Sequence, residues 1–379
     1  MSNSSSIFEF KASRAQRRLW FIHQLHGTSK QYNIPHVVKL TGVLDEKALS
    51  RALNDVSKRH ESLRTYFRYN NEQLFQVVAE PYVHQIEREQ CIKLTKDIEQ
   101  AFCDKVSSTT FELTQLPLFK LYVLSNESNE HLIGFVFHHS ISDGWSFDIF
   151  LRELSHYYQL HHLGNGDELP PLELQYVDYA AWHNECCESD DGPIARTLNE
   201  QVKLLREIPD LALILDKPRP KTSLYNGATE SFKLNETSVI ALEQVASQLS
   251  VTPFSLFMAV WQFVLSRQAR QHDFAVGFPA ACRTRPELED IIGLFMNTAV
   301  VPANLDESRT VNEHITHVHN AILTALEHQD VPVDQLIDHL RPDRDLSIHP
   351  LFQVMLSYHK VAGQRIDWPD LSCEHLAIG

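Results

Sequence analysis

Apolar positions recur along the first half of the chain with two spacings, and each spacing predicts one kind of element. Leu49, Leu53 and Val56 share one face of a helix that Asp45 can cap. Runs of about four to eight residues in which apolar side chains alternate or follow one another predict strands. In the first half, helices are expected at 14–25, 45–59, 94–108 and 146–162, and strands at 34–40, 65–69, 73–78, 117–124 and 131–137.

Capping residues and breakers indicate where these elements begin and end. Ser13 and Ser146 are the expected N-caps of two helices, and Thr252-Pro253 is typical of a helix start. Glycine, polar residues and proline gather at 164–171, which is the expected linker. In the second half, helices are expected at 176–188, 193–207, 237–249, 253–269, 311–328 and 333–340, and strands at 211–215, 229–234, 273–279, 297–304 and 351–358. Because helices and strands do not alternate strictly, the pattern predicts an α+β fold of layered lobes.

Composition and charge exclude several classes of protein. A length of 379 residues suits two or three domains of about 150 residues, and 43% hydrophobic residues exclude a disordered chain. The net charge of −15 argues against a nucleic-acid partner, which favours a basic face. We find no apolar run approaching the ~18 residues of a membrane span and no signal peptide, so no membrane partner is expected. The six cysteines form no C-x-x-C pair, which favours reduced thiols and a cytoplasmic location.

The candidate chemistry lies in the segment 137–146, FHHSISDGWS, between a predicted strand and a predicted helix. Histidine is the side chain best suited to proton transfer near neutral pH, and a helix start offers N–H groups to a developing oxyanion. Asp143 can orient the imidazole of His139 or brace the loop through a basic partner elsewhere in the chain. An H-x-x-x-D pattern also arises by chance in ordinary surface or core segments, so the pattern alone leaves the function open.

Further segments make the interpretation specific. HHSISDG at 138–144 resembles the HHxxxDG signature of condensation domains of non-ribosomal peptide synthetases. Six other segments resemble the remaining motifs of that family, in the family's order: 13–20, 59–67, 176–182, 292–298, 328–332 and 344–351.

The resemblance implies a fold, an activity and partners. The family fold has two chloramphenicol-acetyltransferase-like lobes that form a V with a central tunnel. We expect the lobes at 1–172 and 173–379, with the second ending earlier than is usual in the family. Donor and acceptor peptidyl carrier proteins would each present a thioester on 4′-phosphopantetheine, and an adenylation domain would be a neighbour in the synthetase. The acceptor amine would attack the donor thioester to form an amide, and the domain itself would bind no cofactor.

The resemblance also implies roles for individual residues. His139 is expected at the chemistry, as a base or as a group that holds the amine, and His138 as its structural support. Asp143 is expected to brace the loop by pairing with Arg59 or Arg64. Gly144 would let substrate approach the backbone or would be a loop glycine with positive φ. The remaining residues are Trp145 and Ser146, expected to pack and to cap, and Asn297, expected to line the tunnel or to bond a neighbouring strand.

Several alternatives remain open at this stage. A starter condensation domain would transfer a fatty acyl group, and a non-catalytic carrier-docking relative would keep the fold alone, although His139 and Asp143 argue against the second. Epimerisation, heterocyclisation and plant acyl-CoA transferase relatives carry variants of the signature that this chain lacks. His314, His317 and His319 crowd one predicted helix, but no acidic or cysteine partner completes a metal site, so none is expected.

Overall fold

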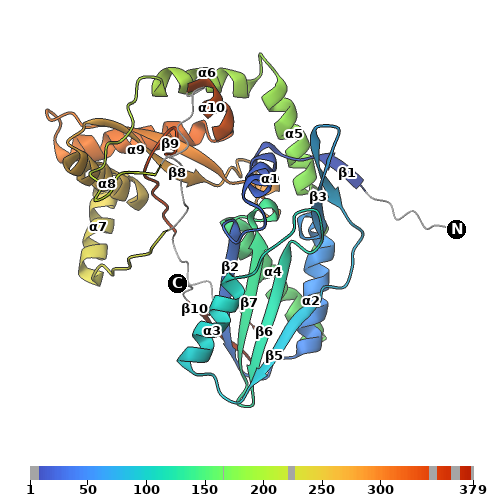
Figure 1. Ribbon diagram of the computed structural model, residues 1–379. Coiled ribbons are helices and arrows are strands. Elements are labelled where there is room, and N and C mark those ends of the chain that lie inside the picture. Colours follow the sequence, from blue (N-terminus) through green and yellow to red (C-terminus); the bar gives the residue numbers. More distant parts are fainter. Residues whose placement is uncertain (1–7, 165, 221–226, 341–347, 360–367, 377–379) are drawn as a thin grey trace. The chain divides into compact units, whose positions relative to one another are not determined.

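The chain forms two compact units, each of which contains segments that are distant in the sequence (Figure 1). The computed structural model describes residues 8–164, 166–220, 227–340, 348–359 and 368–376. The first unit comprises Met1–Glu185, Arg283–Phe295 and Val361–Gly379, and the second comprises Cys186–Cys282 and Met296–Lys360.

The first unit contains two sheets. A five-stranded sheet has the order β10-β2-β7-β6-β5, in which β5 and β6 are parallel and the other neighbours antiparallel. A smaller sheet has the order β1-β4-β3. The elements are β1 (Phe8–Lys11), α1 (Arg14–His26), β2 (Asn33–Thr41), α2 (Glu46–Arg59), β3 (Thr65–Asn70), β4 (Gln73–Val78), β5 (Ile86–Cys91), α3 (Lys96–Ser107), β6 (Phe119–Asn126), β7 (Glu130–His138), α4 (Gly144–Leu163), α5 (Tyr176–Glu188), which runs into the second unit, and β10 (Ser372–Leu376).

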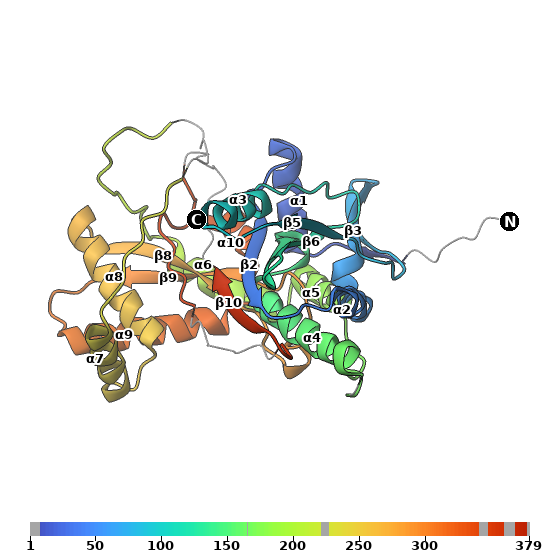
Figure 2. The same ribbon diagram turned by 90° about the horizontal axis from the view of Figure 1, so that it is seen from below.

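Helices cover both faces of the five-stranded sheet (Figure 2). Alternate residues of β7 point to opposite faces, as the period of a strand requires. Phe135 and Phe137 meet Phe147 and Phe150 of α4, with ring centroids 5.0–6.2 Å apart. On the other face, a Cβ at Gly134 would lie 2.4 Å from Val106 of α3, so only glycine allows α3 this close. The sheet therefore fixes β7 and α4, and these two elements hold the loop between them.

The second unit is built around a two-stranded antiparallel sheet, β8-β9. Phe274, Val276 and Phe278 of β8 pack in one core with α8 and α9, whereas Ala275 packs in another with α6 and α10. Each strand face thus has its own helical layer. The elements are α6 (Pro193–Leu205), α7 (Glu236–Gln248), α8 (Pro253–Ala269), β8 (Asp273–Ala280), β9 (Asn297–Asn304), α9 (Val311–Glu327) and α10 (Val333–Leu340).

The expected mixture of helices and strands is confirmed, with differences in particular elements. Among the described residues, 211–215 and 229–234 are not strands, and 351–358 contributes one bridge, from Met355 to Gly277. The strands β1, β5 and β10 were not predicted. The predicted cap Ser146 is wrong, because α4 begins at Gly144 and Asp143 caps it by accepting the N–H of Ser146.

The two compact units also differ from the expected division at 172 and 173. The first unit continues to Glu185 and also includes Arg283–Phe295 and Val361–Gly379. The reason is packing: Trp368 and Leu371 lie in the core of the first unit, and β10 pairs with β2.

The described part of the chain contains no single helix long and apolar enough to cross a membrane. One bent helix pair, α7 with α8 at 104°, meets the length and composition for a span.

Candidate active site

His139 lies in a one-turn 3₁₀ helix, His139–Ile141, which directly follows strand β7. Its backbone N–H donates to the carbonyl of Tyr32 at 2.8 Å, and its ring Nδ1 lies 2.8 Å from the carbonyl oxygen of Ser142. A carbonyl can only accept, so Nδ1 carries the hydrogen and the neutral ring keeps its lone pair on Nε2. The side chain is half-buried, and no described residue bonds Nε2. The ring of His139 is therefore held in one orientation by its Nδ1 bond.

His138 is buried and bonds its own loop. The backbone N–H of Ser140 donates to Nδ1 of His138 at 3.2 Å, and the Ser140 hydroxyl lies 2.7 Å from the same nitrogen. Burial, with the charges of His139 and His23, lowers the pKa of His138 to about 3. The ring is thus neutral at physiological pH, which agrees with the supporting role expected from the sequence.

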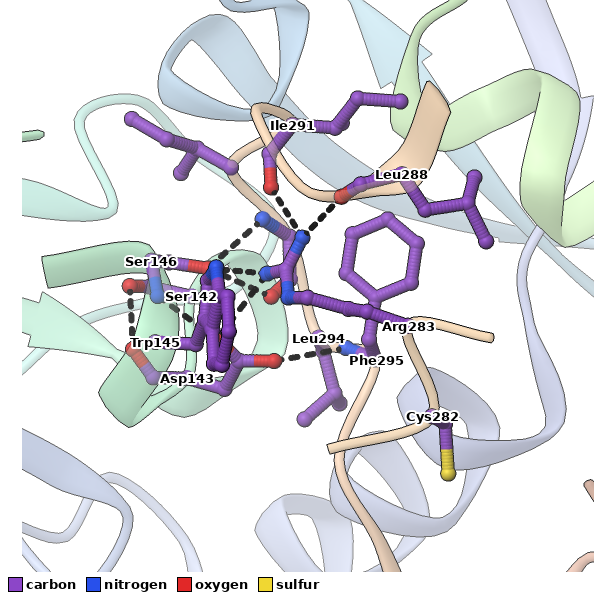
Figure 3. A network of polar contacts seen from close by, with 12 residues as sticks. Ser142, Asp143, Trp145, Ser146, Cys282, Arg283, Leu288, Ile291, Leu294 and Phe295 are labelled. Carbon is purple, nitrogen blue, oxygen red and sulfur yellow. Dashed lines mark hydrogen bonds and ion pairs between the residues drawn. The ribbon is translucent and has the colours of Figure 1, made fainter. Parts of the chain in front are cut away.

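Asp143 is paired with Arg283, a residue that the sequence did not single out (Figure 3). Arg283 Nη2 lies 3.2 Å from Asp143 Oδ1, and both side chains are almost fully buried. The other carboxylate oxygen accepts the N–H of Phe295 at 3.0 Å. Asp143 thus has the buried arginine partner that a brace requires, but this partner is Arg283, and the expectation of Arg59 or Arg64 is wrong.

Those two arginines have other partners in the same unit. Arg59 Nε lies 3.1 Å from Glu153 of α4, and Arg64 Nη2 lies 3.3 Å from Glu61. His60 also binds Glu153, at 2.8 Å. Burial raises the pKa of Glu153, but the bonds from His60 and the charge of Arg59 outweigh it, and the pKa is held below its usual value. The second motif therefore serves the middle of α4 rather than its start.

Arg283 is the first residue of the segment Arg283–Phe295, and its side chain connects this segment to the loop that contains Asp143. Its Nη1 donates to the carbonyls of Leu288 and Ile291, at 2.5 and 2.7 Å, and its guanidinium lies 4.1 Å from the ring centroid of Phe295. Burial lowers the pKa of Arg283, and the charge of Asp143 opposes that shift. The cation therefore ties the start of α4 to a segment 140 residues further along the chain.

Ser146 and Trp145 extend this network (Figure 3). The Ser146 hydroxyl donates to Asp143 at 2.7 Å and accepts from Arg283 Nη2 at 3.0 Å and from the N–H of Gly293 at 3.1 Å. Ser146 is a fully buried centre of hydrogen bonds and not a cap. Trp145, expected to pack, is 48% exposed, and its indole N–H donates to the carbonyl of Glu289 at 3.0 Å.

Two glycines of the motifs have opposite surroundings. Gly144 is the first residue of α4. No heavy atom lies within 4 Å of a Cβ built on it, so a side chain at this position would point into open space. Gly144 does not have the positive φ of the alternative interpretation. A Cβ at Gly293 would lie 2.2 Å from the ring of Tyr176. The Tyr176 hydroxyl donates to the carbonyl of Leu294 at 2.8 Å and accepts from the Ser13 hydroxyl at 2.8 Å. The first, fourth and fifth motifs therefore meet around Tyr176.

Asn297 belongs to the second unit and bonds a turn. Its Nδ2 donates to the carbonyls of Gln329 and Val331, at 2.8 and 2.6 Å, and its Oδ1 accepts the N–H of Val333 at 3.3 Å. The structure thus favours the backbone-bonding role over the tunnel-lining one, although the partner is the sixth motif and not a strand.

The structure joins residues that no local pattern connects. Arg283 follows a strand in the sequence CRTRPE and carries no sequence signal of its own.

Among the described residues, no group of three or more histidine, cysteine or acidic side chains could hold a metal ion. The pKa values of His314 and His317 lie below the ordinary value, and burial is the largest cause of both shifts.

Comparison with known proteins gives the family. The family model described as "Condensation domain" matches residues 9–375. The chain is 32% identical over 364 residues to chondramide synthase cmdD of Chondromyces crocatus, which covers 95% of this chain and 9% of that protein. It is 32% identical over 371 residues to a dimodular nonribosomal peptide synthase of Bacillus subtilis (strain 168), which covers 95% of this chain and 15% of that protein.

A solved structure shares the fold. The crystal structure of the X-domain from teicoplanin biosynthesis matches with a TM-score of 0.86 and 23% identity, over 100% of this chain and 83% of that one. The chain belongs to the condensation domain family, so the resemblance and the chloramphenicol-acetyltransferase-like fold class are confirmed. It spans less than a sixth of either curated relative.

Proposed function

We propose that this chain is a peptide-bond-forming condensation domain of a non-ribosomal peptide synthetase, with His139 as its catalytic residue. The observation that carries the proposal is the hydrogen bond from Nδ1 of His139 to the carbonyl of Ser142, because it leaves a lone pair on Nε2. An amine attacking a thioester must lose a proton as the amide forms, and Nε2 can accept it or align the amine.

The substrates arrive on partners. Donor and acceptor peptidyl carrier proteins each bring a thioester on 4′-phosphopantetheine, and an adenylation domain is the neighbour in the synthetase. The acceptor nitrogen forms a bond to the donor carbonyl carbon, the donor pantetheine sulfur leaves as a thiol, and the chain passes to the acceptor carrier. The N–H of Gly144 at the start of α4 faces the developing oxyanion. The compartment we propose is the cytoplasm.

His139 provides the first prediction. General-base help is worth about 10²–10⁴-fold, so His139→Ala should reduce amide formation by that factor in single turnover with both carriers loaded. The product is read by intact mass of the acceptor carrier, across pH. His161→Ala is the control and should leave the rate unchanged. His161 is a half-buried residue near the C-terminal end of α4, and it pairs with Asp55 of α2. Near-normal amide formation by His139→Ala would remove His139 from the mechanism.

The same assay distinguishes the alternatives. A donor carrier loaded with an aminoacyl group tests the proposal, and one loaded with a fatty acyl group tests the starter type. Binding of both carriers with no amide from either donor would favour a carrier-docking domain and contradict an enzyme.

A further inference from the structure

Gln16 lies in the first turn of α1, and all of its amide is used. The side chain is 1% exposed. Its Oε1 accepts the backbone N–H of Ser13 at 2.9 Å, which completes the capping box of α1. Its Nε2 donates to the carbonyl of Ser140 at 3.2 Å and to Oε1 of Gln76 at 3.3 Å.

Only one of these bonds reaches the loop. A capping box needs the acceptor oxygen alone, and glutamate is equally good at that position. The helix does not need the donor nitrogen, and one of the two bonds from this nitrogen crosses 124 residues to the carbonyl of Ser140, the residue after His139.

The Ser140 peptide is coupled to both histidines. The N–H and hydroxyl of Ser140 bind His138, and its carbonyl lies in the same 3₁₀ turn as His139, one residue further along the chain. A buried carbonyl left without a donor costs about 1–3 kcal/mol, so the turn would shift to find another partner if Gln16 did not reach it.

We propose that Gln16 is a positioning residue for the reaction at His139: its amide nitrogen fixes the Ser140 carbonyl and thereby the direction of the His139 ring. This inference rests on the proposed function. A displacement of about 1 Å at a reacting group can cost 10²-fold in rate, so a single fixed carbonyl can matter to turnover.

The test compares Gln16→Glu with Gln76→Leu. The first keeps the acceptor for Ser13 and the length of the side chain, but an ionised carboxylate cannot donate to Ser140. The second removes a neighbour that is equally buried and leaves the bond from Gln16 to Ser140 in place. We expect kcat to fall about tenfold or more for Gln16→Glu with KM for the acceptor carrier unchanged.

A pH profile separates positioning from loss of stability. A protonated carboxyl can donate again, so the rate of Gln16→Glu relative to the unmodified protein should rise as the pH falls. A flat ratio across pH, or equal kcat losses in the two variants, would overturn the proposal.

A second readout does not depend on turnover. The ¹⁵N signals of the His139 imidazole, assigned with His139→Ala, should shift in Gln16→Glu and stay in place in Gln76→Leu. Unchanged signals in both variants would overturn the positioning role. If the unmodified protein forms no amide, the proposed function fails, while the imidazole signals still decide the role of Gln16.

Discussion

At the scale of single residues, the buried ion pair of Asp143 and Arg283 contributes to the structure in two ways. Asp143 caps α4 through the N–H of Ser146 and neutralises the guanidinium of Arg283. Removing one member of a buried pair leaves the other charge without compensation, which costs far more than the pair itself contributes.

Arg283→Met is therefore expected to lower the free energy of unfolding by about 3–5 kcal/mol, measured by urea denaturation. Arg152→Met is the matched control, because Arg152 and Asp290 form an exposed pair worth about 0–1 kcal/mol. A loss below about 1 kcal/mol for Arg283→Met would contradict the structural role of the pair.

Alanine substitution of the two motif glycines, Gly144 and Gly293, is expected to change the melting temperature in different ways. Gly144→Ala should keep or slightly raise the melting temperature, because its new methyl group meets open space, yet it should slow amide formation if substrate occupies that space. Gly293→Ala should lower the melting temperature, because its methyl group would overlap the ring of Tyr176. Thermal melts and the carrier assay measure both. Full activity of Gly144→Ala would show that substrate stays away from this side of the backbone.

The sequence predicts only part of this site. His138, His139 and Asp143 lie within six consecutive positions, so one motif indicates all three. Arg283 lies 140 residues from Asp143, and no helical or strand period links residues that far apart. The sequence predicts an arginine from the second motif as the partner of Asp143, but Arg59 pairs with Glu153 instead.

At the scale of elements, capping and period predict helices well. The bounds expected for α8, 253–269, agree with the structure, because Thr252 accepts the N–H of Ser255 and Pro253 opens the first turn. The expected strand 229–234 has no partner strand in the described part of the chain, and Phe232 there is 86% exposed. An apolar run can form a strand only where a neighbouring edge is free to pair, and local sequence does not contain that information.

The packing of the segment before β10 provides a prediction. Trp368 is 4% exposed, and its ring lies 5.1 Å from that of Tyr158 on α4. Trp368→Ala should cost about 3–5 kcal/mol of unfolding free energy, measured by chemical denaturation. Trp145→Ala, at a tryptophan that is 48% exposed, should cost much less. Equal losses would mean that the segment before β10 is not part of the core.

At the scale of the whole molecule, three neutral histidines set the response to acid. Burial lowers the pKa of His138 to about 3 and the pKa values of His36 and His84 to about 4. In the unfolded chain a histidine has a pKa near 6.5, so between about pH 6.5 and pH 4 the unfolded state binds more protons than the folded one. Stability therefore falls as the pH falls through this window.

Each histidine contributes at most about 1.4 kcal/mol per pH unit to that fall. His84 also bonds Ser57 and packs on Phe119, so His84→Gln should lower stability at neutral pH but make its pH dependence shallower. Urea denaturation at about pH 7 and about pH 5 measures the two slopes. Equal slopes for the variant and the unmodified protein would show that His84 takes up its proton in the folded state.

The pairing of β10 with β2 sets the order in which the protein can be completed. Residues 372–376 lie beside residues 37–41, so more than three hundred residues separate the two strands in the sequence. A nascent chain leaving the ribosome therefore exposes the free edge of β2 throughout synthesis of the second unit, and closing so long a loop is intrinsically slow. One edge of β2 can pair with β7 early, but the other edge waits for β10, and this unprotected strand edge is where we expect chaperones to engage the growing chain.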